Sequence, residues 1–399
     1  MNKVLGLIVE LNPFHNGHKY FIDEAIKHVK PEVVIALTSG NYTMRGEISV
    51  VDKFTKTKQL LNLNVDLVLE LPFLSAMNSA DFFALNSLNI LSKFKITDLA
   101  FGVELANLDK LNQMKAIIDS DLFNEKIKEK LALGLSYSAS SYKVISELTK
   151  DKELIENFTL PNNTLGIQYL RSIEKLKKKI NVTLIKRIEN NYYDEIALSE
   201  IASATSLRLL LEKNEDIEKY VPDFGFKINY QNPKEIEEKL LFLLRSQFIN
   251  LTLSDIQKIF GVNEGIENRI NNFLNKVNSY QELINNVKTK RYPQNKIKRL
   301  LLHIIMNTSN KYLDKSNYYF RVLGASDKGL NYINKLPKTT KAKIITSFKN
   351  MENNDLVLQE LKATKLYGLI TNQPNLYLEE FKVPIIGGKK WQPKKSKRN

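Results

Sequence analysis

Two histidines lie three residues apart near the N-terminus, in the segment Asn12-Pro13-Phe14-His15-Asn16-Gly17-His18. The segment follows a short apolar run, and the residues after it have the spacing of a helix that buries one face. Gly17 allows a tight turn at the start of this helix, where free N–H groups and the positive end of the helix dipole attract phosphates. We therefore expect His15 and His18 to donate hydrogen bonds to a nucleoside triphosphate as charge develops in the transition state.

Two other interpretations of the histidine pair stay open. A pair at positions i and i+3 can bind a metal ion, but no third ligand lies nearby in the sequence, so we expect no metal site. The segment could also be a surface turn where two histidines meet by chance. The chain has only 4 His, and this makes chance less attractive.

A second segment, Ile201-Ala202-Ser203-Ala204-Thr205-Ser206-Leu207-Arg208, has the pattern of a turn followed by a helix. Ser203 or Thr205 could cap this helix, and Arg208 would point back one turn later. Hydroxyls, N–H groups and an arginine at a helix start can hold a triphosphate. Taken alone, an ordinary capped helix with a surface arginine explains the segment as well.

Five nearly continuous apolar runs suit parallel strands that are covered on both faces. They are Val4–Glu10, Val33–Leu37, Leu67–Leu71, Leu99–Val103 and Val182–Ile185. Helical patterns separate them, at Asp52–Leu63, Asn78–Phe94, Asp109–Ile118 and Thr164–Leu176. This alternation predicts an α/β fold, a Rossmann-like doubly wound parallel five-stranded sheet, with its ligand at the carboxyl ends of the strands.

Several polar segments come directly after predicted strands or open predicted helices. Gly102 would let adenine or ribose approach the backbone closely. Asn162 or Asn163 could read adenine or ribose, and Arg187 with Ile188 could meet the adenosine at the end of the fifth strand. Ordinary loop structure is an alternative for each, and their common location at strand ends supports an adenosine site.

The loop from Thr38 to Glu47 follows the second predicted strand, so it should lie at the same edge of the sheet. Arg45 could bind a carboxylate or a phosphate there. Gly40 and Asn41 precede it, and we place all three tentatively at the substrate.

The charge is uneven along the chain, which carries a net +15. Residues 1–220 contain 28 Lys and Arg against 29 Asp and Glu, and residues 221–399 contain 31 against 15. We therefore predict a catalytic ATP-binding domain at 1–220, a mainly α-helical basic region that binds a polyanion at 221–385, and a basic flexible tail at 386–399. A solubility effect of a lysine-rich composition is the alternative. The region contains consecutive helical patterns and one β-like run, at Pro233–Asn250, Leu253–Phe260, Glu264–Val277, Tyr280–Val287, Gln294–Met306 and Tyr318–Leu323.

Composition excludes several classes of protein. The chain has no Cys, so disulfides, thiolate metal sites and acyl-thioester chemistry on the chain are excluded. No apolar stretch reaches about 18 residues, and the N-terminal run has no leader pattern, so we expect a cytoplasmic protein that does not bind membranes. No stable protein partner is evident.

The histidine segment resembles the HxGH signature of the nucleotidyltransferase superfamily, and Ile201–Arg208 resembles its ISSTxIR segment with Ala204 in place of the second Ser. Over essentially the whole chain the sequence resembles the family of bacterial tRNA(Met) cytidine acetate ligases. The segments that carry this resemblance are Gly6 to His18, Ser39-Gly40-Asn41, Arg45-Gly46-Glu47, Val51-Asp52-Lys53, Asp66 to Phe73, Ser79-Ala80-Asp81, Phe101 to Glu104, Pro161-Asn162-Asn163 with Leu165-Gly166, Tyr193-Asp194, Ile201 to Arg208, and Arg321 to Gly324. Met44 and Leu11 depart from the family pattern without removing a charged or phosphate-facing group.

The resemblance implies that ATP and acetate form acetyladenylate and that the acetyl group passes to N4 of the wobble cytidine of elongator tRNA(Met). It implies that Mg²⁺ accompanies ATP. His15, His18 and Arg208 would be catalytic, and the ATP site would also include Leu7, Ile8, Val9, Glu10, Asn12, Pro13, Phe14, Asn16, Gly17, Gly102, Asn162, Asn163, Arg187, Ile188, Ser203 and Thr205. Two rivals remain: an adenylyltransferase for a phosphorylated metabolite, and an RNA-binding protein without enzymatic activity. No general base for the cytidine amine is apparent in the sequence.

Overall fold

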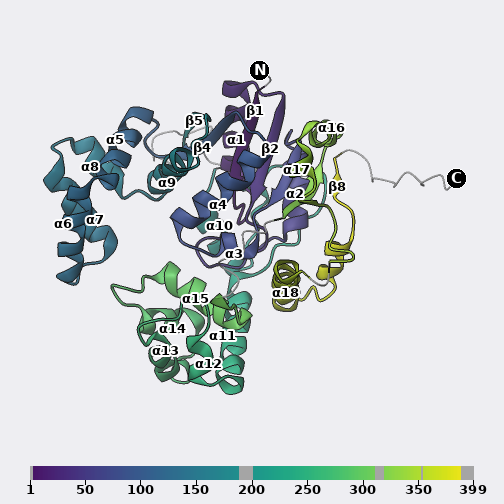
Figure 1. The fold of residues 1–399 in the computed structure, drawn as a ribbon. Coiled ribbons are helices and arrows are strands. Elements are labelled where there is room, and N and C mark those ends of the chain that lie inside the picture. The colour runs from purple at the N-terminus through teal and green to yellow at the C-terminus, as the bar shows by residue number, and fades with distance from the viewer. Residues whose placement is uncertain (1–2, 188–200, 311–318, 352–353, 388–399) are drawn as a thin grey trace.

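The computed structural model describes residues 3–187, 201–310, 319–351 and 354–387 (Figure 1). Five parallel strands form the centre of the fold in the order β5-β4-β1-β2-β3. Their bounds are β1 Val4–Val9, β2 Val33–Thr38, β3 Leu67–Glu70, β4 Asp98–Val103 and β5 Asn181–Lys186. The predicted doubly wound α/β fold is confirmed. The chain reverses its direction across the sheet between β1 and β4, which is where such folds bind ligands.

The predicted number of five strands was too small, because three strands from the second half extend the sheet. Strand β6 (Phe320–Ala325) pairs antiparallel with β3, and two short strands, β7 (Ile344–Ile345) and β8 (Ile385–Ile386), pair with β6. The addition covers the edge of β3, whose backbone N–H and C=O groups would otherwise lack partners. The region 221–385 is therefore mainly helical but also contributes to the central sheet.

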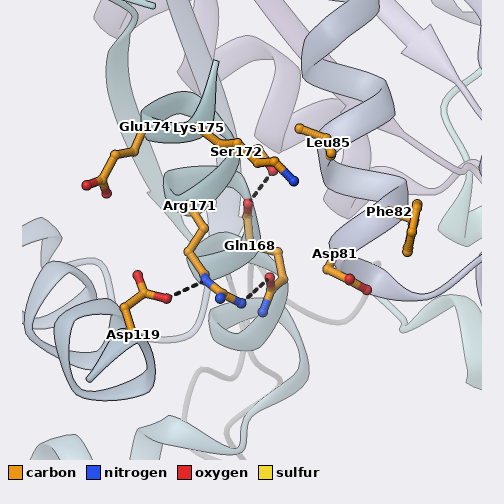
Figure 2. A pocket seen from close by; sticks show the side chains of 9 residues that line it. All are labelled: Asp81, Phe82, Leu85, Asp119, Gln168, Arg171, Ser172, Glu174 and Lys175. Atoms are coloured by element: carbon orange, nitrogen blue, oxygen red, sulfur yellow. Dashed lines mark hydrogen bonds and ion pairs between the residues drawn. The ribbon is translucent and has the colours of Figure 1, made fainter. Parts of the chain in front are cut away.

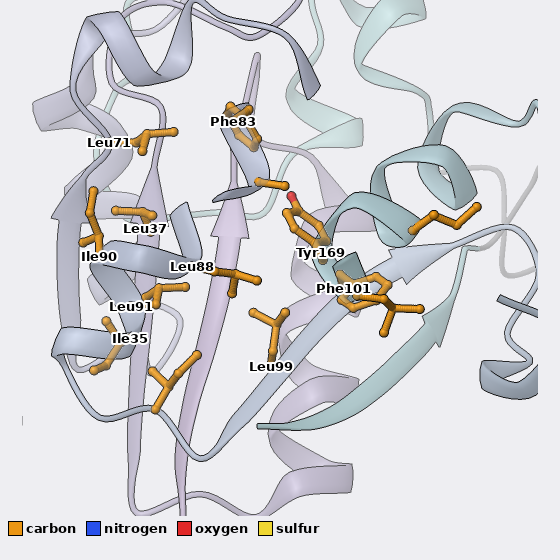
Figure 3. Close-up of a cluster of buried hydrophobic side chains, with 14 of the residues drawn as sticks. Ile35, Leu37, Leu71, Phe83, Leu88, Ile90, Leu91, Leu99, Phe101 and Tyr169 are labelled. Carbon is orange, nitrogen blue, oxygen red and sulfur yellow. The ribbon is translucent and has the colours of Figure 1, made fainter. Parts of the chain in front are cut away.

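Helices cover both faces of the sheet. On one face α1 (Asn16–Val29) and α2 (Lys53–Leu61) pack against alternate residues of β1 and β2. On the other face α4 (Ala80–Lys93) and α9 (Pro161–Lys175) bury the side chains shown in Figure 3, with α16 (Asp327–Lys335) beside them. The nearly continuous apolar strands are explained by this burial on two sides.

Four of the helices between β4 and β5 form a group beside the sheet (Figure 1). They are α5 (Leu108–Asp119), α6 (Asp121–Ala132), α7 (Tyr137–Leu148) and α8 (Lys152–Phe158). The sequence analysis predicted only the first. Helix α6 buries just Phe123 and Ile127, so its apolar pattern is weak in the sequence.

The second half begins with α10 (Ala204–Glu212) and the short 3₁₀ helix η1 (Glu218–Tyr220), and continues into a bundle. The bundle consists of α11 (Pro233–Asn250), α12 (Leu253–Gln257), α13 (Ile266–Leu274), α14 (Tyr280–Val287) and α15 (Gln294–Met306), close to the predicted ranges. Its apolar core includes Tyr42, Phe73 and Met77 from the first half. The bundle and the sheet therefore share buried surface. None of the helices in the described ranges has the length and apolarity needed to cross a bilayer.

The last described helices pack near the sheet. They are α17 (Lys338–Lys341), α18 (Asp355–Ile370) and η3 (Leu376–Phe381), and α18 contacts the short helix α3 (Phe73–Ala76) of the first half. A buried charge cluster joins them to α2: Lys53 Nζ lies 2.5 Å from a carboxylate oxygen of Glu70 and 2.5 Å from one of Glu380. Arg321 on β6 donates to the carbonyl of Glu380 at 3.0 Å. Buried charges of this kind need such partners, since an unpaired one is costly.

Candidate active site

The two histidines form the cap of α1 at the carboxyl end of β1. His15 Nδ1 accepts a hydrogen bond from the backbone N–H of Gly17 at 3.1 Å, and His18 Nδ1 accepts one from the N–H of His15 at 3.3 Å. The ring centroids are 3.8 Å apart. Since each Nδ1 is an acceptor, the proton of each neutral ring is on Nε2. The two side chains therefore present two Nε2–H donors at the start of a helix.

Burial keeps both imidazoles uncharged. Burial, together with a smaller effect of the Arg187 guanidinium, lowers the pKa of His15 to about 4. Burial also lowers the pKa of His18, with smaller effects from His15, Arg187 and Lys56. At neutral pH both rings are therefore neutral hydrogen-bond donors, and Arg187 supplies a positive charge near them.

The predicted second segment packs directly against the histidine segment. Ser203 accepts from the N–H of Ser206 at 3.0 Å and caps α10, as predicted. Arg208 Nη1 donates to the carbonyl of Asn12 at 2.8 Å, and Nη2 donates to Thr205 Oγ1 at 3.3 Å. Residues almost 200 positions apart in the sequence therefore lie together, and Thr205 contacts the guanidinium instead of capping the helix.

Several predicted ATP-site residues have side chains in the protein core. Leu7, Val9 and Phe14 are buried, and Ile8 packs against the core on the opposite face of the sheet. Pro13 is also buried. Only the backbone of these residues can face a nucleotide, so their side chains position the strand end and the turn.

Asn12 and Asn16 tie the turn to more distant parts of the chain. Asn12 Oδ1 accepts from the N–H of Val50 at 2.9 Å, and Asn16 Nδ2 donates to the carbonyl of Lys219 at 3.2 Å. These bonds hold both flanks of the histidine pair.

Asn163 lies near the predicted adenosine site, but its side chain is used by the protein. Its Oδ1 accepts from the N–H groups of Glu104 and Leu105, each at 3.0 Å, and its Nδ2 donates to the carbonyl of Asn157 at 3.0 Å. Asn162 Nδ2 donates to Glu104 Oε1 at 2.6 Å. The Asn163 amide is fully buried and makes these three bonds, so it orders the loop after β4, and its contact with adenosine stays a prediction.

Gly102 and Arg187 lie beside each other at the ends of β4 and β5. A Cβ on Gly102 would be 3.5 Å from Cγ of Arg187, which is ordinary contact. The two residues therefore lie at the same strand edge as predicted. Ile188 lies outside the described residues.

The loop after β2 is held against the site by residues that the sequence analysis did not select. Lys56 is fully buried, and its Nζ donates to the carbonyls of Glu10 and Gly40, each at 2.7 Å. Asn41 Oδ1 accepts from the N–H of Lys53 at 2.8 Å. Lys53 and Lys56 fall on the buried face of α2. Lysine is rarely buried, so two lysines at core positions of a helical pattern are the feature of the sequence that could have identified them.

Helix α15 of the bundle reaches the same loop. Glu47 forms ion pairs with Arg208, at 3.4 Å, and with Lys298 on α15, at 3.2 Å. Arg299 Nη1 donates to the carbonyl of Met44 at 2.8 Å. The basic helical half is therefore in direct contact with the loop that carries Arg45.

A cavity of about 390 Å³ lies elsewhere, between α4, the end of α5 and α9 (Figure 2). Its lining includes Phe82, Arg171 and Asp119, and Arg171 Nε is 2.8 Å from Asp119 Oδ1. None of the predicted site residues lines it. The site at the strand ends is therefore defined by its hydrogen bonds and not by this cavity.

Comparison with known proteins agrees with this arrangement. A sequence model described as HIGH Nucleotidyl Transferase matches residues 1–380. The chain is 34% identical to the tRNA(Met) cytidine acetate ligase of Caldanaerobacter subterraneus, over 96% of this chain and 99% of that protein. The Staphylococcus aureus protein of the same name is 33% identical with the same coverage.

The chain belongs to the tRNA(Met) cytidine acetate ligase family of HIGH nucleotidyl transferases. The crystal structure of Thermotoga maritima TmcAL in its apo form superimposes with a TM-score of 0.84 at 28% identity, covering 96% of this chain and 99% of that one. The same protein bound with alpha-thio ATP superimposes with a TM-score of 0.83. The resemblance noted in the sequence is thereby confirmed, and the fold of this family member matches over nearly its whole length.

Proposed function

We propose that this chain is an ATP-dependent ligase that activates acetate as acetyladenylate and then acetylates N4 of the wobble cytidine of elongator tRNA(Met). The observation that carries the proposal is the pair of neutral imidazoles, His15 and His18. Their Nε2–H donors lie beyond the carboxyl end of β1, where the strand order of the sheet reverses. Relatives that carry the name tRNA(Met) cytidine acetate ligase, and the neighbour bound with alpha-thio ATP, support it.

In the first half-reaction an acetate oxygen attacks the α-phosphorus of ATP, and pyrophosphate leaves. His15 and His18 would donate to phosphate oxygens on which charge builds up, and this stabilises the transition state more than the ground state. The N-terminus of α1 adds backbone N–H groups to the same region. Arg208, with the hydroxyls of Ser203 and Thr205, would hold the triphosphate.

The adenosine would lie along the ends of β4 and β5. Gly102 and Arg187 meet there, and the partly buried Asn162 opens α9 nearby. Acetate would lie toward Gly40, Asn41 and Arg45, on the other side of the histidines. In this proposal the two reactants would lie on either side of the α-phosphate.

Mg²⁺ would enter with ATP. Within the described parts of the chain no three His, Cys, Asp or Glu side chains gather as metal ligands. Phosphate oxygens and water are the usual ligands of Mg²⁺ beside a nucleotide. The ion would neutralise part of the triphosphate charge, and the protein would contribute few direct ligands.

The tRNA would bind to the basic second half, which has 31 Lys and Arg against 15 Asp and Glu in residues 221–399. Helix α15 connects this half to the loop beside the histidines through Lys298 and Arg299. Binding through phosphates predicts strong weakening with salt. A cytoplasmic location, where tRNA is found, follows from the proposal.

Two measurements test the function. Incubation with ATP, labelled acetate and total tRNA, followed by nucleoside analysis, should yield labelled N4-acetylcytidine. The variant His18→Ala should lose acetate-dependent ATP–pyrophosphate exchange while it keeps its thermal transition. Unchanged exchange in this variant would remove the assigned role of the histidines, and label in a metabolite instead of tRNA would favour an adenylyltransferase.

A further inference from the structure

We infer that Glu10 accepts the proton of the cytidine amine in the second half-reaction and hydrogen-bonds that amine beforehand. The inference rests on the proposed function and deepens it, because the sequence offered no general base for this step. The argument comes from where the Glu10 carboxylate lies, which groups hold it, and which oxygen is left for a substrate.

Glu10 follows β1 directly and precedes the histidine segment, so its carboxylate is at the carboxyl edge of the central strand. One oxygen, Oε1, accepts from the backbone N–H of Met44 at 2.7 Å. Among the described residues the other oxygen, Oε2, has no hydrogen-bond partner, and the side chain is only partly buried. The carboxylate is thus oriented by one bond and keeps one oxygen for a ligand.

Several charged and polar groups surround Glu10 and connect it to the proposed active site. Lys56 on α2 donates to the Glu10 carbonyl, and the charge of the same lysine contributes to the lowered pKa of His18. The charges of Arg45 and Glu47, on the loop after β2, act on the pKa of Glu10, and Glu10 contributes to the raised pKa of Tyr169 on α9. The carboxylate therefore contacts the loop that we assign to acetate, and the Glu10 backbone directly precedes the histidine segment.

The backbone after Glu10 is held in an unusual conformation. Leu11 has φ of 54°, in the left-handed region, although it is a bulky residue with a buried side chain. The next residue, Asn12, is held by Val50 and Arg208. Non-glycine residues persist in this region when the surrounding structure determines them, and such positions cluster at functional sites.

The chemical step balances with Glu10 as the base. The lone pair of cytidine N4 attacks the acetyl carbonyl carbon of acetyladenylate and forms a C–N bond. The bond between that carbon and the phosphate oxygen breaks, and AMP leaves with the electron pair. N4 loses one proton to Glu10 Oε2, which later passes it to water.

The environment makes Glu10 a stronger base than an exposed carboxylate, because its pKa is raised. Burial raises the pKa of Glu10, while the Met44 N–H and the Lys56 and Arg45 charges act in the opposite direction. A general base is most effective when its pKa lies close to the working pH. A carboxylate that accepts from N4–H also selects cytidine, because carboxylates pair with this donor and uridine has an acceptor at that position.

The test separates the two half-reactions in the full-length protein. The variant Glu10→Gln keeps the size of the side chain and can still meet the Met44 N–H, but it cannot take a proton. We expect acetyl transfer to tRNA in single turnovers to fall by about 100-fold or more, while ATP–pyrophosphate exchange falls by less than about tenfold. The remaining transfer should rise with pH without the plateau of the wild-type profile.

Equal loss of both reactions in Glu10→Gln would assign Glu10 to adenylation and overturn the inference, and so would transfer at the wild-type rate. If the Gln variant does not fold, Glu10→Asp answers the question: a shifted pH profile of transfer alone supports the inference, and an unshifted profile contradicts it. A wild-type chain that makes no labelled N4-acetylcytidine would overturn the proposed function itself, so the two failures are distinguishable.

Discussion

Lys56 Nζ donates to the carbonyl oxygen of Glu10 at 2.7 Å, from a side chain that is completely buried. A second bond of the same length goes to Gly40, so one lysine joins the ends of the neighbouring strands β1 and β2. These two ends carry the histidine segment and the proposed acetate loop. The spacing of the two proposed substrate sites therefore depends on Lys56.

Replacing Lys56 by Met should loosen this connection. The carbonyls of Glu10 and Gly40 would lose their buried donor, which costs about 1–3 kcal/mol of unfolding free energy for each unsatisfied group. Urea denaturation should show the loss, and ATP–pyrophosphate exchange should fall with it. A matched control is Lys58→Met on the exposed side of the same helix, which should leave both measurements nearly unchanged. Equal stability of the two variants would contradict the role of Lys56.

The difference in unfolding free energy between Lys56→Met and wild type should also depend on pH. Burial lowers the pKa of Lys56 to about 7, against an ordinary value of 10.5. Between these values the unfolded chain binds more protons than the folded chain, so this group makes stability rise as the pH increases from 7 toward 10.5. Lys56→Met should lack this contribution, and the stability difference between variant and wild type should therefore grow over that range.

His15 combines a structural and a chemical role that one substitution can separate. Asn is among the best helix caps, so His15→Asn should retain the cap on α1 while it removes the Nε2–H donor. We expect the thermal transition to change little and ATP–pyrophosphate exchange to fall by about 100-fold or more. Exchange near the wild-type rate would show that the imidazole donor is not needed.

The same variant should become less sensitive to acid. The pKa of His15 is about 4 in the folded chain against 6.5 ordinarily, so the unfolded chain binds more protons between these values. The contribution of His15 to stability is therefore present above pH 6.5 and is lost as the pH falls toward 4. Since the two proteins should have similar transitions at neutral pH, His15→Asn should melt at increasingly higher temperature than wild type as the pH falls from 6.5 toward 4.

Gly46 is where the bundle contacts the loop beside the site. It has φ of 78°, and a Cβ there would be 2.5 Å from the backbone nitrogen of Arg299 on α15. Gly46→Ala should therefore push the helix away and cost about 1–3 kcal/mol of unfolding free energy. Acetyl transfer to tRNA should fall more than pyrophosphate exchange, because α15 connects to the proposed tRNA-binding half.

Gly225 provides the control for this substitution. It also has positive φ, 69°, but a Cβ there would meet nothing within 4 Å. Gly225→Ala therefore carries the conformational strain without the clash. If the two alanine variants are equally stable and equally active, the contact between Gly46 and α15 is not important.

A substitution of Glu380 tests how helix η3 is attached to the sheet. Its carboxylate lies 2.5 Å from Lys53 Nζ and both groups are fully buried, so Glu380→Ala removes a partner from a buried charge. Loss of this kind costs about 3–5 kcal/mol of unfolding free energy. The neighbouring Glu379 pairs with Lys382 at the surface, and Glu379→Ala should cost at most about 1 kcal/mol. Similar denaturation midpoints for the two variants would contradict the role of the buried cluster.

The sequence by itself determined the features that depend on interactions between residues close together in the chain. Strand β1, the glycine turn and the helix after it are neighbours in the chain, so a continuous apolar run and helical spacing predicted where the histidine segment lies, and helical spacing predicted most helices of the second half. The positions of His15, His18 and the Ser203 cap follow from local geometry, because a cap is made by residues next to the helix it ends. The uneven charge was also visible without a structure.

Only the tertiary structure decided which distant groups meet. The antiparallel pairing of β6 with β3, the contact of Arg208 with Asn12 and the burial of Lys56 join segments far apart in the chain. Local spacing carries no information about such partners. The same limit explains Asn163, whose position at a strand end suggested a nucleotide contact, while its hydrogen bonds to the loop after β4 depend on how that loop packs.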